Sequence, residues 1–149
     1  MHLSRVAAYL LLLANAAVLV NAAPSLIDAL STHQNLTSIQ TLLTDQIPGL
    51  LAQLETHDSA NPITLLAPSN AAFDKIPYYD VIGPAWAGND LDWITSIMQY
   101  HVILGEHTSK TLNTSFQYLE TSLMNSSQTN VTGGQRVSMP RLKDVWNHS

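Results

Sequence analysis

The histidines are the residues whose type and spacing come closest to a metal-binding or catalytic pattern. His101 and His107 stand six positions apart, and Glu106 precedes the second of them. Zinc and iron sites need several ligands held at a defined geometry, and no His-x-x-x-His pair or third ligand completes a set here. His101 also falls on the apolar side of an expected helix, where a buried, hydrogen-bonded imidazole is the simpler interpretation. The sequence therefore predicts no metal site and no cofactor.

A catalytic nucleophile is equally hard to place. The chain contains no cysteine, which removes thiol catalysis, thiolate zinc sites, iron–sulfur clusters and disulfides together. No Gly-x-Ser-x-Gly sequence is present, the pattern that marks the nucleophile of many serine hydrolases. Asp90 and Asp92 flank an expected helix start, where the helix dipole stabilises carboxylates. These observations favour a protein that is not an enzyme.

Two groups of side chains are candidates for binding a partner. Tyr78, Tyr79 and Trp86 lie in a segment rich in proline and glycine, and such aromatics either stack on a carbohydrate or pack beneath their own loop. The second group is basic and lies near the C-terminus: Arg136, Arg141 and Lys143. It either contacts an acidic polysaccharide or is an ordinary solvated surface. For both groups the second alternative is the simpler one.

Composition limits the class of protein further. The 149 residues suffice for one domain, and 46% of them are hydrophobic while 11% are charged, which excludes a disordered chain. Six basic residues stand against eleven acidic ones, for a net charge of −5. Nucleic-acid binding requires a dense positive surface to neutralise phosphates. The acidic balance therefore argues against a nucleic-acid partner.

The first 22 residues are typical of a secretory signal peptide. Arg5 precedes an apolar run over residues 6–20, which is shorter than the ~20 residues that a membrane span needs. Small residues then predict cleavage between Ala22 and Ala23. A membrane anchor is the alternative. With cleavage, residues 23–149 form the mature chain, which has no further long apolar run and hence no expected integral membrane span.

N-glycosylation sequons support export independently. The motif Asn-x-Ser/Thr occurs more often than the residue frequencies would produce by chance, and in secreted proteins it marks surface loops. Its occurrence in Ser/Thr-rich loops by accident is the alternative. The five candidate asparagines are Asn35, Asn113, Asn125, Asn130 and Asn147.

Hydrophobic periodicity predicts helices early in the mature chain. An apolar patch over 26–30 predicts one or two helical turns, and Thr37 and Gln40 have the spacing of a capping box. Apolar residues then recur as in an amphipathic helix, at Ile39, Leu42, Leu43, Ile47, Leu50, Leu51 and Leu54. Pro48 removes a backbone donor within this run, so we expect two short helices with a break over 45–49.

A short strand and further helices should follow. The apolar run over 63–67 lies between two prolines and predicts a buried strand, after which Ser69 or Asn70 caps a short helix. Residues 76–89 are expected to form a structured loop. Asp90 then caps a helix with an apolar face made of Leu91, Ile94, Ile97, Met98, His101 and Val102.

The last third of the chain carries weaker signals. Residues 106–112 are expected to be extended, and 116–124 either helical or extended. Gly133-Gly134 permits the positive φ angles of a two-residue hairpin turn, so we expect a hairpin between 130–132 and 135–139.

Two stretches of this sequence together resemble the fasciclin domain family of secreted and surface adhesion proteins. The segment Ile63-Thr64-Leu65-Leu66-Ala67-Pro68-Ser69-Asn70-Ala71-Ala72-Phe73-Asp74-Lys75-Ile76 is similar to the family's first box. The segment Tyr100-His101-Val102-Ile103-Leu104-Gly105 is similar to its Tyr-His box. The positions that match the motifs are Thr64, Ala67, Pro68, Asn70, Ala72, Phe73, Tyr100, His101 and Gly105.

The resemblance implies an α+β fold, a β-sandwich-like wedge with several helices packed at one side. It also implies adhesion or matrix interaction rather than catalysis, with cell-surface or matrix proteins or polysaccharides as partners. The roles that it implies for Tyr100 and His101 are structural. The expected location is extracellular, secreted or associated with the cell surface or cell wall.

One departure from the family pattern concerns the last box. An Asn-Gly-x-x-His-x-Ile-Asp-like strand should follow the hairpin, and residues 143–149 do not match it. We therefore expect a single incomplete domain over 23–149, with the last strand or strands missing. An unpaired sheet edge would remain, so this chain alone should be marginally stable and prone to associate. Cooperative thermal unfolding of a purified monomer would contradict that expectation.

The function that the sequence favours is adhesion by a secreted, N-glycosylated protein through non-covalent recognition. The alternative is a small secreted hydrolase, or a carbohydrate- or lipid-binding module, with an unrecognised site. A deep polar pocket with convergent ionisable groups near Tyr78, Trp86 or His107 would favour the enzyme, and a flat or filled surface would favour adhesion.

Overall fold

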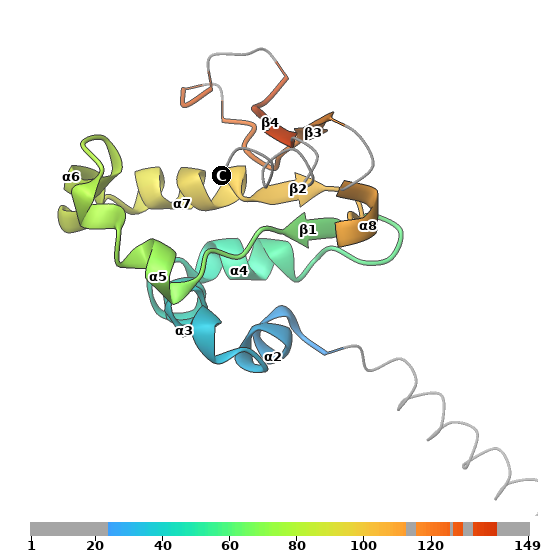
Figure 1. The fold of residues 1–149 in the computed structure, drawn as a ribbon, viewed down its shortest axis with the longest axis horizontal. Helices are drawn as coiled ribbons and strands as arrows, with labels where there is room; N and C mark the ends of the chain where they lie inside the picture. Colours follow the sequence, from blue (N-terminus) through green and yellow to red (C-terminus); the bar gives the residue numbers. More distant parts are fainter. Residues whose placement is uncertain (1–23, 113–115, 126, 130–132, 140–149) are drawn as a thin grey trace, which may run out of the picture.

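The computed structural model describes residues 24–112, 116–125, 127–129 and 133–139. Helices dominate the first part of this range and short strands follow, so the fold is α+β (Figure 1). The helical elements are α2 (Leu26–Ser31), η1 (Gln34–Leu36), α3 (Thr37–Thr41), η2 (Leu42–Gln46), α4 (Pro48–Leu54), α5 (Asn70–Phe73), η3 (Ile76–Tyr78), α6 (Ile82–Ala87), α7 (Leu91–Tyr100) and α8 (Ser109–Leu112). The strands are β1 (Ile63–Leu65), β2 (Val102–Leu104), β3 (Gln117–Glu120) and β4 (Arg136–Met139).

The predicted break in the amphipathic run is confirmed. The α3 helix widens into the π-helical turn η2, where the Ile47 amide donates to the Leu42 carbonyl at 3.0 Å. Ile47 then leaves the helical region with φ −126° and ψ 53°, and Pro48 starts α4 at a position where no backbone donor is needed.

The predicted capping box at Thr37 is wrong. The N-cap residue of α3 is Leu36, which forms no side-chain cap bond. A capping box does occur at the start of α2, where the Ser25 hydroxyl accepts from the Asp28 amide and the Asp28 carboxylate accepts from the Ser25 amide. The Thr37 hydroxyl is used differently, as an acceptor for the Asn70 side chain.

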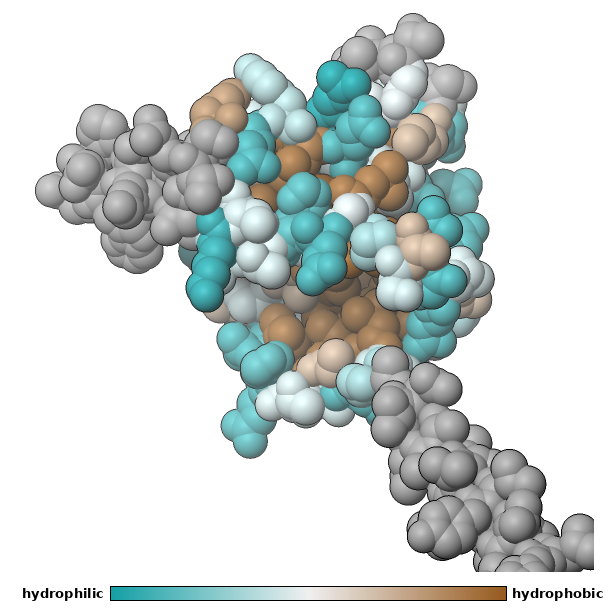
Figure 2. Space-filling model, turned by 90° about the vertical axis from the view of Figure 1, so that its right-hand side faces the viewer, coloured by the Kyte–Doolittle hydropathy of each residue, from teal (hydrophilic) through white to brown (hydrophobic). Residues whose placement is uncertain are grey.

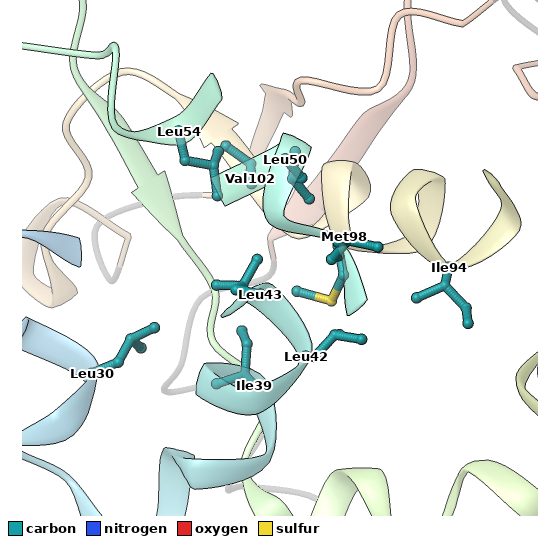
Figure 3. Close-up of a cluster of buried hydrophobic side chains, with 10 residues drawn as sticks. Leu30, Ile39, Leu42, Leu43, Leu50, Leu54, Ile94, Met98 and Val102 are labelled. Carbon is teal, nitrogen blue, oxygen red and sulfur yellow. The ribbon is translucent and has the colours of Figure 1, made fainter. Parts of the chain in front are cut away.

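The core is built from the predicted apolar stripe. Figure 3 shows side chains from α3, η2 and α4 directed toward those of α7 and β2. Leu51 is the one member of the stripe that is only half-buried. The buried cluster consists of Leu30, Ile39, Leu42, Leu43, Ile47, Leu50, Leu54, Ile94, Met98 and Val102.

The strands form two antiparallel pairs. β1 pairs with β2, with Thr64 opposite Ile103, and β3 pairs with β4. Among the described residues, one isolated bridge between Ile103 and Thr121 connects the pairs, and the Ser122 amide donates to the Val102 carbonyl at 2.8 Å nearby. Within the part of the chain that is described, the sheets are two-stranded, so the expected sandwich wedge stays a prediction.

Residues 76–89 are not the expected loop. They form η3 and α6, because Pro77 and Pro84 both lie in first turns, where proline needs no donor. Gly83 lets the two elements approach closely, since a β-carbon there would lie 3.2 Å from the carbonyl oxygens of Ile76 and Pro77.

One expectation about the last third is also corrected, and another involves residues outside the described range. Residues 109–112 form the short helix α8, with reciprocal bonds between Thr108 and Thr111, instead of an extended segment. β4 pairs with β3, and the expected hairpin partner, 130–132, lies outside the described residues. Gly133 and Gly134 do adopt the expected positive φ, 95° each.

Candidate functional site

The two segments that resemble family boxes meet along the β1–β2 pair. The Leu66 amide donates to the His101 carbonyl at 2.8 Å, and the Gly105 amide donates to the Pro62 carbonyl at 2.9 Å. Leu65 packs against the buried core, and β1 itself is half-buried where a buried strand was expected. The first box and the Tyr-His box are therefore one structural unit.

Asn70 connects the first box to the start of the core helices. Its side-chain oxygen accepts from the Ser38 amide at 2.9 Å. Its side-chain nitrogen donates to the Thr37 hydroxyl at 2.9 Å and to the Gln34 carbonyl at 3.3 Å. Asn70 thus satisfies free groups at the start of α3, more than thirty positions earlier in the chain. Its own short helix, α5, begins after Ser69 without a side-chain cap.

Thr64 holds the turn that follows the Tyr-His box. Its hydroxyl donates to the Gly105 carbonyl at 2.8 Å and accepts from the His107 amide at 2.9 Å. Gly105 has φ +96°, and a β-carbon there would lie 3.1 Å from the His107 ring. That ring donates from Nε2 to the Leu104 carbonyl at 3.0 Å. Thr64, Gly105 and His107 together fix the chain as it leaves β2.

Replacing Thr64 by valine keeps the shape and removes both hydrogen bonds. We expect a loss of about 1–3 kcal/mol in the free energy of unfolding, because the His107 amide loses its partner in a half-buried place. Urea denaturation measures it. The matched control is Thr56→Val, where the hydroxyl is exposed and bonds within its own turn. Equal losses in the two variants would contradict the role assigned to Thr64.

His101 is half-buried, not fully buried as the helical stripe suggested. It ends α7, and its Nδ1 donates to the Ile97 carbonyl at 2.8 Å. The Tyr100 ring lies edge-on to it, with 6.4 Å between ring centres. The rings of His101 and His107 are thus tied to different carbonyls. Over the described residues, no three His, Asp or Glu side chains come close enough to hold a metal ion.

A pocket of about 470 Å³ opens beside the Tyr-His box, between α5, α6 and α7. We call it the apolar pocket. Its walls are mainly hydrophobic and include Phe73, Ile82, Trp86, Ile97 and Met98. Of the charged or imidazole side chains, it contains only Lys75 and His101. Its lining contains no carboxylate, and its other polar side chains are those of Ser69 and Tyr79. The sequence did not predict this pocket, because the residues of α6 were expected to form a loop.

The aromatic trio separates into two environments. Trp86 packs edge-on against Phe73, with 5.5 Å between ring centres, at the margin of the core. Tyr78 and Tyr79 are 84% and 53% exposed, and Val81 next to them is 69% exposed. We call these three residues the exposed knob. The simpler alternative, packing beneath the loop, therefore fits Trp86 but is wrong for Tyr78 and Tyr79, which remain available to a partner.

A second hollow, of about 670 Å³, has a different character. Leu26, Leu54 and Ile63 form its apolar part, and carboxylates stand among its lining residues, from Glu55, Asp58 and Glu106. Figure 2 shows hydrophobic surface recessed among hydrophilic residues on this side of the molecule. Ser25, His57 and Ser59 also line it, and the His57 ring donates from Nδ1 to the Asn61 carbonyl at 2.9 Å.

Two candidate glycosylation sites are described. Asn35 is exposed in η1, and Asn125 is exposed, with its side-chain oxygen accepting from the amide and hydroxyl of Ser127 at 3.1 and 2.7 Å. The candidates Asn113, Asn130 and Asn147 lie outside the described residues, as do the cleavage residues Ala22 and Ala23.

The basic group near the C-terminus can be placed only at its first member. Arg136 donates to the Glu120 carboxylate at 3.0 Å across β3 and β4, and both side chains are exposed. Such a surface pair contributes little to stability. Arg141 and Lys143 lie outside the described residues.

No helix among the residues that the structure describes has the length and apolar character needed to cross a membrane.

Comparison with models of protein families yields a match. A family model described as a fasciclin domain covers residues 18–143, a range that includes both boxes, the apolar pocket and the exposed knob. Neither the curated proteins nor the solved structures provide a match.

Proposed function

Because the chain belongs to the fasciclin domain family, whose domains are typically non-enzymatic adhesion modules, we propose that it is a secreted, N-glycosylated adhesion protein. It recognises cell-surface or matrix proteins or polysaccharides by non-covalent contact. Residues 1–22 direct export and are removed between Ala22 and Ala23. The exposed positions of Asn35 and Asn125 support their use as glycan acceptors. The bridge between Ile103 and Thr121 supports the idea that both sheets belong to one wedge.

The observation that carries this proposal is the exposed knob. Its three side chains come from neighbouring positions of one segment and are all exposed, whereas the other exposed large hydrophobic residues among those described, Leu91, Phe116, Tyr118 and Met124, lie in other segments. Tyrosines that offer rigid, amphipathic contact area are enriched among residues that dominate binding interfaces. Asn70 and Thr64 of the boxes, in contrast, are occupied with hydrogen bonds inside the fold. Recognition is therefore assigned to the knob and structural support to the boxes.

The test uses beads coated either with the unchanged full chain or with a variant of it. It measures the fraction of beads that cells of the source organism retain under flow. We expect the double variant Tyr78→Ser, Val81→Ser to reduce retention by about tenfold or more, because loss of interface anchors typically costs over 1 kcal/mol each. Neither residue contributes to the apolar pocket.

The matched control is Tyr118→Ser, since Tyr118 is 70% exposed but lies on β3. It should leave retention unchanged. Equal retention of the knob variant and the unchanged chain would contradict the assignment of recognition to the knob.

A further inference from the structure

We propose that the apolar pocket binds a small amphipathic carboxylic acid, of the class of medium-chain fatty acids. Its volume of about 470 Å³ lies in the usual range of small-molecule sites, which combine mostly apolar walls with a few polar groups. Tyr79 of the exposed knob also lines this pocket, but the binding proposed here does not rest on adhesion.

The walls suit an alkyl chain. Phe73 from α5, Trp86 from α6 and Ile97 and Met98 from α7 surround the space. Phe73 and Trp86 are held edge-on against each other and pack on the core, and Met98 is 3% exposed. These side chains are therefore fixed by the fold before a ligand arrives, which lowers the entropic cost of binding.

The charge of the pocket favours a ligand with an anionic head group. In a chain with a net charge of −5, the lining of this pocket contains Lys75 and no carboxylate. Lys75 is exposed, and the only ion pair among the described residues joins Arg136 to Glu120. Its ammonium group is therefore free to pair with an anionic ligand, and a partly desolvated pair at the mouth of an apolar pocket is stronger than one in open water.

His101 supplies a second polar group in the pocket that suits a carboxyl head. Its Nδ1 must carry hydrogen, because a carbonyl oxygen only accepts, and the Ile97 carbonyl is its partner. Nε2 is left without a partner among the described residues. As a neutral nitrogen it accepts from the acid proton of a carboxyl group, and once protonated it donates to a carboxylate. Lys75 and His101 together thus match a carboxylic acid in both of its states.

The experiment titrates the full chain with decanoate, below its micelle concentration, by calorimetry and by NMR of the tryptophan indole signals. We expect saturable binding of one decanoate per chain, with a shift of the Trp86 indole signal. Decanol, which has the same chain and no charge, should bind at least fivefold more weakly. Binding of decanol as tightly as decanoate, or absence of saturable binding, would overturn the proposal.

Two variants locate the site. Lys75→Gln should weaken decanoate at least fivefold and leave decanol unchanged, whereas Lys110→Gln, a change of the same kind on α8, should change neither. Ala71→Trp places a large side chain at an exposed lining position and should weaken both ligands at least tenfold. Ala52→Trp, on the exposed side of α4, is its control.

Circular dichroism of each variant shows whether the fold is kept. Unchanged decanoate binding by folded Lys75→Gln or by folded Ala71→Trp would overturn the assignment. A dimer that is detected by sedimentation and does not bind decanoate would also overturn it, because a second copy of the chain would then occupy the apolar pocket. The Tyr78→Ser variant should bind decanoate with unchanged affinity. A failure of the adhesion proposal can therefore be distinguished from a failure of the decanoate proposal.

Discussion

Replacing Leu43 by alanine should lower the free energy of unfolding by about 2–5 kcal/mol, the range found for buried leucines. Leu43 is 0% exposed and lies in η2, between the two helices that the chain break separates (Figure 3). Its side chain is part of the cluster shared by α3, α4, α7 and β2. A cavity here removes contacts from all of them, and the surrounding backbone cannot collapse onto it without shifting the break.

Denaturation in urea, followed by far-ultraviolet circular dichroism, measures this loss. Leu51→Ala is the matched control, because Leu51 belongs to the same apolar stripe but is only half-buried. It should cost clearly less than Leu43→Ala. A cost below about 1 kcal/mol for Leu43→Ala would contradict the placement of this residue at the centre of the core.

Replacing Asn70 by alanine should cost about 2–3 kcal/mol, because three hydrogen bonds to the start of α3 are lost at once. The Ser38 amide is left without its partner in a half-buried place. The effect exceeds that of an ordinary helix cap, since the bonds also hold α5 against α3.

The aspartate variant separates the two halves of this network. Asn70→Asp keeps an oxygen for the Ser38 amide and loses the donors to Thr37 and Gln34. Its unfolding free energy should therefore lie between that of the unchanged chain and that of the Asn70→Ala variant. Asn61→Ala, at an exposed loop position, should be near neutral. A near-neutral Asn70→Ala would show that these hydrogen bonds do not explain the asparagine in the first box.

Local patterns predicted those parts of the fold that local physics determines. The stripe from Ile39 to Leu54 identified the core helices, and Pro48 identified the break between them. Asp90 was correctly predicted to cap α7, where its carboxylate accepts from the Trp93 amide at 3.1 Å. In each case the signal and its consequence lie within one or two helical turns of each other.

Other features depend on contacts between distant segments, which a periodicity cannot reveal. Val102 continues the apolar spacing of α7, and pairing with Leu65 turns it into the first residue of β2. Thr37 had the right spacing for a capping box, but Asn70 reaches it from more than thirty residues away. The proline- and glycine-containing segment 76–89 looked like a loop because its two prolines stand at helix starts.

The candidate sites divide in the same way. Tyr78 and Tyr79 were singled out from the sequence, although Trp86 belongs to the core margin. The apolar pocket was not foreseen, because it arises only when α6 folds over α5 and α7. A binding role for Lys75 could not be predicted from the sequence, since a single lysine indicates a binding site only when the neighbouring pocket is known.

Native-state hydrogen exchange of the Leu66 and Gly105 amides tests most directly whether the two boxes form one cooperative unit. These amides bond to the His101 and Pro62 carbonyls across the β1–β2 pair. We expect both to exchange with the same opening free energy, and Leu43→Ala to lower both values equally. The boxes would be shown to be independent by either of two results. In the first, the Leu66 amide exchanges at the rate of an unfolded peptide; in the second, Leu43→Ala changes the exchange of only one of the two amides.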